Sequence, residues 1–286
     1  MLLLDGKATA LKIRQELKET IESFCHKGVR APGLAVILAG DDPASEIYVR
    51  NKEKACESVG IRTLSSRLPG TVSQDELLAR IAQANESPDI DGILVQLPLP
   101  RHIDTATCLL SIFPDKDVDG FHPDNAGRLT LGLPGLRPCT PQGILELLAR
   151  YGLACAGKRA VVVGRSNIVG KPLALMLAQP GPVGNATVTI CHSKSEDLAE
   201  HCRNAGFLFL SVGRPRMFGR DMIKNGACVV DVGINRTKDG ICGDADFEAI
   251  KDKTSAITPV PGGVGPMTIA MLIKNTVQAW QTHLGL

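Results

Sequence analysis

A lysine stands where the stretch from Ser45 to Ile61 calls for an apolar side chain. Wound as a helix at about 100° per residue, this stretch is amphipathic, and Lys52 lies at the centre of its apolar face. Tyr48 precedes Lys52 by one turn, so the phenol and the amine point into the same space. Burying an ammonium group is costly unless a function needs it there. The alternative is a lysine whose stem covers the core while its amine reaches solvent.

Three more polar side chains are candidates for ligand binding. Gln96 stands in an apolar run near the carboxyl end of a predicted strand, the edge at which open α/β sheets bind ligands. Backbone partners would satisfy its amide equally well. Asp117 and Asp119 follow in a loop, where an aspartate either bonds nearby backbone or accepts from the paired N–H groups of a ligand. Apart from His122 no further ligand lies at suitable spacing, so we predict no metal site.

A glycine-bracketed turn from Gly164 to Gly170 lies between an apolar strand and a helix. This order is typical of a Rossmann domain, whose turn and helix N-terminus bind a pyrophosphate. Ser166 replaces the middle glycine of the usual pattern. The next strand ends in neutral and basic residues instead of the acidic residue that binds the ribose of NAD, and Arg165 lies in the turn. The pattern therefore favours NADP, although ordinary surface residues would look the same.

The elements that must position these residues form two α/β domains. In the N-terminal half, helical patterns at 7–27, 45–61 and 74–84 alternate with buried strands at 33–38 and 92–97. In the C-terminal half, strands are predicted at 160–163, 186–191, 207–212 and 228–232. Their alternation with helices is typical of a doubly wound, mainly parallel sheet.

The Gly- and Pro-rich segment 132–141 marks the boundary between the domains, before a predicted helix at 142–151. We therefore assign 1–140 to an N-terminal domain and 141–265 to the Rossmann domain. A second Gly- and Pro-rich loop, 257–266, leads into a last helix. Its glycines would let backbone approach a ligand closely, or the loop is a plain connection.

Composition excludes several functional classes. The chain has 286 residues, 44% of them hydrophobic and 22% charged, as in a soluble globular protein. A net charge of +2 and 3% aromatic residues argue against a nucleic-acid partner. No apolar run approaches a membrane span and no signal peptide is apparent, which predicts a cytoplasmic protein. The nine cysteines are scattered singly, as expected for reduced, mostly buried thiols.

Several motifs together resemble one family, the bifunctional methylenetetrahydrofolate dehydrogenase/methenyltetrahydrofolate cyclohydrolases. They follow one another over almost the whole chain, and no motif position departs from the family pattern. The matching stretches are 48–52 with 60–61, 91–100, 116–121, 137–141, 163–172, 231–235 and 259–268.

The resemblance implies a folate cleft between the Rossmann domain and an N-terminal domain that the last helix, 266–286, completes. The enzyme would oxidise 5,10-methylenetetrahydrofolate with NADP⁺ and hydrolyse the methenyl product to 10-formyltetrahydrofolate. It would act in one-carbon metabolism and purine biosynthesis, as a homodimer.

By the same resemblance, the site residues follow by position. Lys52 is the catalytic lysine, Tyr48 packs against the pterin, Gln96 orients Lys52 and Asp119 accepts from the pterin amino edge. The remaining substrate contacts come from Pro261, Gly262 and Gly263. The cofactor contacts are Gly164, Arg165, Ser166, Ser193 and Ile234.

Two other functions are compatible with parts of the pattern. An NADP-dependent dehydrogenase of a hydroxy or amino acid would use Lys52 as proton donor, but a carboxylate substrate usually needs an arginine clamp, and Arg50 points away from Lys52. A cofactor-sensing regulator would bind NADP without chemistry, and it leaves Lys52 unexplained.

Overall fold

The computed structural model describes residues 1–238 and 240–286, and the chain forms two compact units. Unit 1 comprises Met1–Leu11 and Thr140–Thr268, and unit 2 comprises Lys12–Cys139 and Ile269–Leu286. Two long helices, α1 (Gly6–Cys25) and α10 (Val264–Leu284), supply residues to both units. In the described part of the chain, no helix has the length and apolar character needed to cross a membrane.

The first residues of the chain are grouped with its C-terminal half. Residues 1–11 belong to unit 1. The reason is β1 (Leu2–Leu3), which pairs in parallel with β11 (Ala256–Ile257). Leu2 N donates to Ser255 O at 2.7 Å, and Leu4 N donates to Ile257 O at 2.9 Å. These backbone bonds attach the first residues of the chain to the sheet of its C-terminal half.

Unit 1 is built on a six-stranded parallel sheet, which confirms the predicted doubly wound α/β fold. Its strands in spatial order are β1, β11, β8 (Cys228–Asp231), β7 (Phe207–Leu210), β5 (Arg159–Val163) and β6 (Thr187–Cys191). Because the chain continues from β5 to one neighbour and later to the other, the order reverses beside β5. Open α/β sheets bind ligands at such a switch point.

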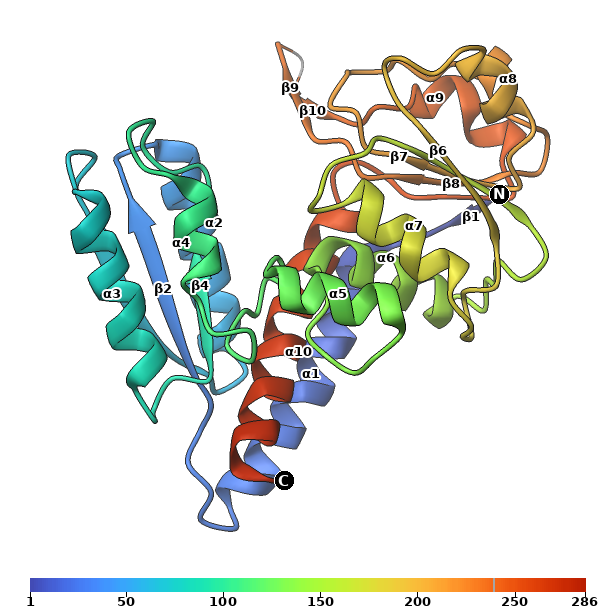
Figure 1. Ribbon diagram of the computed structural model, residues 1–286. Helices are drawn as coiled ribbons and strands as arrows, with labels where there is room; N and C mark the ends of the chain where they lie inside the picture. The colour runs from blue at the N-terminus through green and yellow to red at the C-terminus, as the bar shows by residue number, and fades with distance from the viewer. Residues whose placement is uncertain (239) are drawn as a thin grey trace. The chain divides into compact units, whose positions relative to one another are not determined.

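Helices cover both faces of this sheet. Figure 1 shows α6 (Cys139–Arg150) and α7 (Gly170–Ala178) on one face, and α8 (Leu198–Arg203) and α9 (Phe247–Ile250) on the other. Alternate strand residues such as Val161 and Val163 pack with Cys202 and Ile250 in one buried cluster. Helix α6 begins three residues earlier than predicted. Short 3₁₀ helices lie at Arg220–Met222 and Lys251–Lys253, and an antiparallel hairpin of β9 (Asn235–Thr237) and β10 (Gly240–Cys242) was not predicted.

Unit 2 contains a parallel three-stranded sheet in the order β3 (Arg62–Leu68), β2 (Gly33–Ala39) and β4 (Gly92–Val95). Strand β2 is buried on both faces, as its unbroken apolar run predicts. Strand β3 was missed because it is a polar edge strand that exposes most of its residues. The helices are α2 (Pro43–Glu57), α3 (Gln74–Glu86), α4 (Thr105–Leu110) and α5 (Pro123–Leu131).

The C-terminal half of α10 is anchored within unit 2. Trp280 is fully buried, its Nε1 donates to Arg30 O at 3.0 Å, and its ring meets Phe24 edge-on at 5.5 Å. His283 Nδ1 lies 3.2 Å from Asp91 Oδ1. The buried Asp91 carboxylate also accepts two hydrogen bonds from Arg30, at 2.7 and 2.8 Å, which lower its pKa against the opposing effect of burial. These contacts fix the helix in the core of unit 2.

Candidate active site

Helix α2 presents Lys52 on its inner side. The helix begins at an Asp42 N-cap, whose carboxylate accepts from Ser45 N at 2.9 Å, and Gly60 just beyond its end has a φ of +93° that favours glycine. Val49 is 1% exposed, so the predicted apolar face is indeed buried. Tyr48 is the exception, because it is 44% exposed. Helical spacing places Tyr48 on the apolar face beside Lys52, but this residue is not buried there.

The side chain of Lys52 contacts that of Gln96, which is the first residue beyond β4. Gln96 N continues the strand ladder by donating to Ile37 O at 2.9 Å, which fixes the backbone at this point. The side-chain amide donates through Nε2 to Leu97 O at 2.6 Å, so Oε1 faces the other way and accepts from Lys52 Nζ at 3.2 Å. The amide therefore holds the lysine amine in one direction. Lys52 and Gln96 are both half-buried.

In the motif from Lys116 to Asp119, two charged side chains bond other groups of the protein and a third, Asp119, is free to bind a ligand. Lys116 Nζ donates to three backbone carbonyls at the end of α3, at 2.6 to 3.3 Å, and burial lowers its pKa. Asp117 Oδ2 accepts from His122 N at 2.7 Å and from Asn125 Nδ2 at 3.0 Å. Asp117 therefore bonds nearby protein groups, which is one of the two alternatives for these aspartates. Within the described chain, Asp119 has no hydrogen-bond partner.

Asp119 lies close enough to Lys52 for their charges to interact. Burial raises the pKa of Asp119 to about 6, while the attraction of Lys52 opposes this shift and the charge of Asp117 adds to it. Cys139, which is buried beside these groups, has its thiol pKa raised well above the usual value by burial. Unit 2 thus gathers an oriented amine, an amide and an unpaired carboxyl group.

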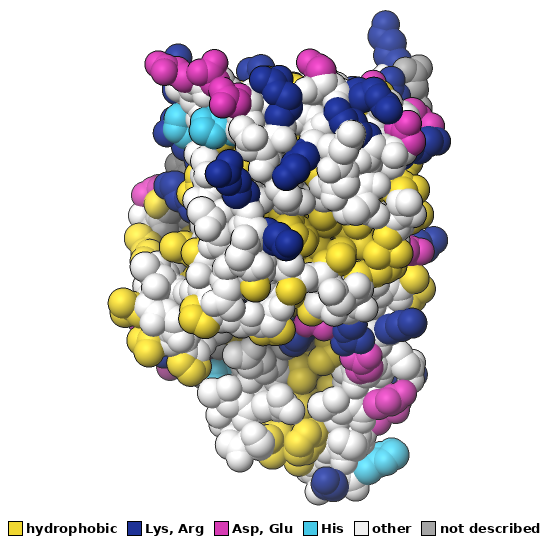
Figure 2. Space-filling view, turned by 90° about the vertical axis from the view of Figure 1, so that its right-hand side faces the viewer, with side chains coloured by type: hydrophobic (Ala, Val, Ile, Leu, Met, Phe, Trp, Pro, Cys, Tyr) yellow, Lys and Arg dark blue, Asp and Glu magenta, His cyan; other side chains and the backbone are white. Residues whose placement is uncertain are grey.

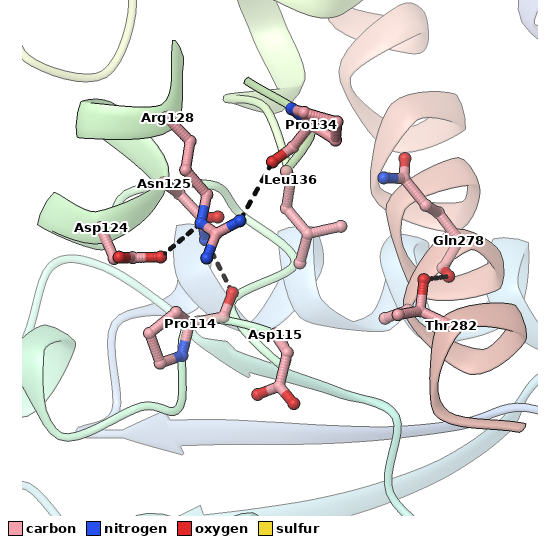
Figure 3. A pocket seen from close by; sticks show the side chains of 11 residues that line it. Pro114, Asp115, Asp124, Asn125, Arg128, Pro134, Leu136, Gln278 and Thr282 are labelled. Carbon is pink, nitrogen blue, oxygen red and sulfur yellow. Dashed lines mark hydrogen bonds and ion pairs between the residues drawn. The ribbon is translucent and has the colours of Figure 1, made fainter. Parts of the chain in front are cut away.

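A cavity of about 540 Å³ in unit 2 contains none of the predicted site residues. Figure 3 shows Arg128 of α5 turned toward Asp124 and Pro134, with Gln278 and Thr282 of α10 on the opposite wall. The buried Asn125 side chain belongs to its lining and donates to Pro114 O at 2.7 Å as well as to Asp117. The wall of the cavity therefore supports the loop that carries Asp119.

The glycine-bracketed turn in unit 1 lies at the switch point beside β5. A Cβ atom at Gly170 would stand 2.1 Å from Gly164 O, so the start of α7 packs directly on the end of β5. Gly164 has a φ of +126°, and a Cβ there would stand 2.5 Å from Ser211 O. Ser166 Oγ accepts from Val169 N at 3.1 Å and so occupies one of the N–H groups at the helix start. Both glycines are needed for this close turn.

Three further predicted cofactor contacts lie at the same carboxyl edge of the sheet. Arg165 and Ser193 are exposed, and neither forms a hydrogen bond or ion pair with another part of the chain that the structure describes. Ile234 follows β8 and is 49% exposed. These side chains are therefore available to a ligand at this edge, with Arg165 as the cation.

The predicted substrate loop lies in unit 1, between β11 and α10. Lys7 N donates to Gly262 O at 2.9 Å, and Gly262 has a φ of +106°. A Cβ atom at Gly263 would stand 2.5 Å from Pro259 O. The two glycines thus allow a compact turn, and the hydrogen bond attaches it to the start of α1. Pro261 lies in the same turn and is exposed.

Two family models together match almost the whole chain. The model of the tetrahydrofolate dehydrogenase/cyclohydrolase catalytic domain matches residues 4–119, and the model of its NAD(P)-binding domain matches residues 138–284. A bifunctional protein FolD of Desulfovibrio desulfuricans is 64% identical over 98% of this chain and 99% of its own length. The chain belongs to the tetrahydrofolate dehydrogenase/cyclohydrolase family.

Solved structures of family members agree with the fold. The bifunctional FolD enzyme of Campylobacter jejuni superposes with a TM-score of 0.95 at 51% identity, covering 99% of both chains. The methylenetetrahydrofolate dehydrogenase-cyclohydrolase of Trypanosoma brucei, solved with NADP and an inhibitor, gives 0.93 at 37% identity over 100% of this chain and 99% of its own. This member of the family is therefore an enzyme, a dehydrogenase and cyclohydrolase of folates with an NAD(P)-binding domain.

The sequence analysis did not single out two buried carboxylates, Asp244 and Asp231. Both bind backbone N–H groups at the carboxyl edge of the unit 1 sheet, where the predicted cofactor contacts lie. Asp244 accepts from Val212, Gly213 and Arg214 N–H groups at 2.7 to 3.1 Å, and from Asn235 Nδ2 at 2.9 Å. It therefore ties the loop after β7 to the loop after β8, which carries Ile234.

The second carboxylate, Asp231, ends β8. It accepts from Gly233, Asp244 and Ala245 N–H groups at 2.8 to 3.0 Å, yet burial raises its pKa to about 6 against these bonds. The sequence contains a signal that could have indicated this residue, since Asp231 is a charged residue at the end of an apolar strand.

Proposed function

We propose that this enzyme oxidises 5,10-methylenetetrahydrofolate with NADP⁺ and hydrolyses the 5,10-methenyl product to 10-formyltetrahydrofolate, with Lys52 as the key catalytic residue of the hydrolysis. Family membership supports the two reactions. The observation that carries the role of Lys52 is its 3.2 Å hydrogen bond to Gln96, whose own amide is fixed by Leu97. A preorganised amine costs little reorganisation during reaction.

The hydrolytic step needs proton transfers that an amine can perform. Water adds to the methenyl carbon and loses a proton, and the bond from that carbon to N5 breaks as N5 gains a proton. The hydroxyl proton is released when the formyl carbonyl forms, so one proton is produced overall. Lys52, in its neutral form, can accept the proton of the attacking water and return it to N5. Gln96 keeps the amine directed at the reacting carbon.

Asp119 and Tyr48 would hold the folate. The Asp119 carboxyl group is unpaired in the described chain, so it is available to accept from the paired N–H groups of the pterin edge. Tyr48 is 44% exposed, and its ring would offer a surface on which a pterin stacks. Pro261, Gly262 and Gly263 would complete the substrate contacts through a closely approaching backbone.

The cofactor that fits unit 1 best is NADP. When bound, its nicotinamide accepts the hydride from the methylene carbon, which needs no acid or base from the protein. Gly164 and Ser166 would line the pyrophosphate, while Arg165 and Ser193 would receive the 2′-phosphate. Ile234 would pack against the nicotinamide side. Arg165 supports this assignment because no carboxylate of the described chain neutralises it.

The proposal also covers the oligomeric state and the cellular role of the enzyme. Figure 2 shows hydrophobic side chains exposed among Lys and Arg on one face of unit 1, and the edge strand β6 leaves Ile190 41% exposed. Exposed apolar surface of this kind supports a homodimer. We assign the enzyme to the cytoplasm and to one-carbon metabolism that supplies purine biosynthesis.

Absorbance assays that score nicotinamide reduction and methenyl decay separately test the proposal. The wild type is given 5,10-methylenetetrahydrofolate with NADP⁺ or with NAD⁺, and NADP⁺ should be preferred. Lys52→Met should still reduce the nicotinamide but let methenyl product accumulate. The matched control is Lys54→Met, which removes an exposed lysine from the same helix and should behave like the wild type. Unchanged methenyl decay in Lys52→Met would refute the role of Lys52.

A further inference from the structure

A fully buried asparagine of α10 is bonded to the loop that carries Asp119. Asn275 Nδ2 donates to Val118 O at 2.8 Å and to Arg137 O at 2.8 Å, and it lies 3.6 Å from Cys139 Sγ. All these groups belong to unit 2. Both amide hydrogens are therefore used on backbone carbonyls of two separate segments, one of which immediately precedes Asp119.

The two segments that Asn275 joins pack backbone against backbone. A Cβ atom at Gly120 would stand 2.4 Å from the carbonyl carbon of Arg137, so no side chain separates them. Since a peptide group is planar, fixing Val118 O also fixes the N–H and the Cα of Asp119. The carboxylate of Asp117 holds the other side of the loop, through His122 N. The Asp119 side chain thus leaves a backbone that is restrained from two directions.

The asparagine is retained at some cost. Its Oδ1 is buried and has no hydrogen-bond partner among the described residues. An unpaired buried amide oxygen is destabilising, so packing alone would favour an apolar side chain here. The donors provide the compensation, because without them Arg137 O would lose a partner and Val118 O would keep only the Cys139 Sγ donor at 3.3 Å.

We infer that Asn275 is a positioning residue for substrate binding, which sets the direction of the Asp119 carboxyl group through its two hydrogen bonds. This inference rests on the proposed role of Asp119 as the folate anchor. It assigns a function in substrate affinity to a helix residue with no direct access to the substrate. Loss of the two donors lets the peptide between Val118 and Asp119 rotate, so the Asp119 carboxyl group is no longer aligned with the N–H groups of the pterin edge.

Steady-state kinetics of Asn275→Ala tests the inference. The KM for 5,10-methylenetetrahydrofolate should rise about tenfold, the effect expected for a hydrogen bond that orients a binding group, while kcat and the KM for NADP⁺ change less than twofold. The matched control is Thr276→Val. Thr276 is also fully buried, but its hydroxyl donates to Leu272 O of its own helix at 2.8 Å, so the folate KM should stay within twofold of the wild type.

A double-mutant cycle separates positioning from a general structural effect. If Asn275 acts through Asp119, adding Asn275→Ala to Asp119→Asn should raise the folate KM no further than Asp119→Asn alone. A full additional rise, or an equal rise in the KM for NADP⁺, would overturn the inference. If Asp119→Asn raises the folate KM but Asn275→Ala does not, only the inference fails. If Asp119→Asn leaves the folate KM unchanged, the proposed role of Asp119 itself fails.

A milder variant covers the case in which Asn275→Ala does not fold. Asn275→Ser keeps one short donor, and its folate KM should lie between those of the wild type and Asp119→Asn. Fluorescence of Trp280, on the same helix and in the core of unit 2, reports whether each variant is folded. A folded Asn275→Ser with wild-type folate KM would contradict the inference.

Discussion

Replacing Asp119 by asparagine should stabilise the folded protein at neutral pH while it weakens folate binding. Burial raises the pKa of Asp119 to about 6. In an unfolded chain an aspartate titrates near about 3.9. The ionised form is therefore less favourable in the folded state than in the unfolded one. Asparagine has nearly the same shape and cannot ionise, so it removes this penalty.

The sign and size of the effect follow from the two pKa values. A carboxyl group with a raised folded-state pKa binds its proton more tightly in the folded protein, so its contribution to stability falls as the pH rises from about 4 to about 6. A difference of about two pKa units corresponds to about 3 kcal/mol. Because Asp119 is partly exposed, solvent screening reduces the expected gain of Asp119→Asn at pH 7.5 to about 1–3 kcal/mol, and at pH 5 to about half of that.

Urea unfolding followed by fluorescence measures this gain. Trp280 is the single tryptophan and is buried in unit 2, so its signal reports the unit that contains Asp119. Asp117→Asn is the matched control, because the Asp117 carboxylate accepts two hydrogen bonds and should lose stability when its charge is removed. No gain for Asp119→Asn at pH 7.5, or an equal gain at pH 5 and pH 7.5, would refute the electrostatic reasoning.

Two further outcomes test other parts of the structure. Arg165→Ala should raise the KM for NADP⁺ by about 10- to 100-fold, because a charge-assisted hydrogen bond to phosphate is lost. The KM for NAD⁺ should stay nearly unchanged, and an equal rise in KM for both cofactors would exclude a 2′-phosphate contact. Lys116→Met should lower the free energy of unfolding by about 2–4 kcal/mol, because three carbonyls at the end of α3 lose their donor. A urea midpoint equal to that of the wild type would contradict this stabilising role of Lys116.

The buried strands and the direction of Lys52 could be predicted from the sequence because apolar periodicity reports burial directly. Strand β2 is apolar throughout and is buried on both faces. The meeting of Lys52 with Gln96 required two such patterns, a helix face and a strand end, to face the same side of one sheet. Tyr48 shows the limit of periodicity, since a residue on the apolar side of a helix is exposed where no other element covers it.

Other features depended on contacts that leave no local pattern. Strand β3 is polar and lies at an edge, so its alternation is weak. Strand β1 is only two residues long and gains its structure from β11, far along the chain. Asp244 and Asn275 bind backbone groups of distant segments, and only the fold brings these segments together.

The most direct test of the central claim supplies 5,10-methenyltetrahydrofolate itself, without cofactor, to the wild type and to Lys52→Met. This isolates hydrolysis from hydride transfer and from NADP binding. With Lys52 as the residue that moves protons during hydrolysis, Lys52→Met should hydrolyse the methenyl compound at the uncatalysed rate, while Lys54→Met matches the wild type. Wild-type hydrolysis by a folded Lys52→Met would contradict the claim.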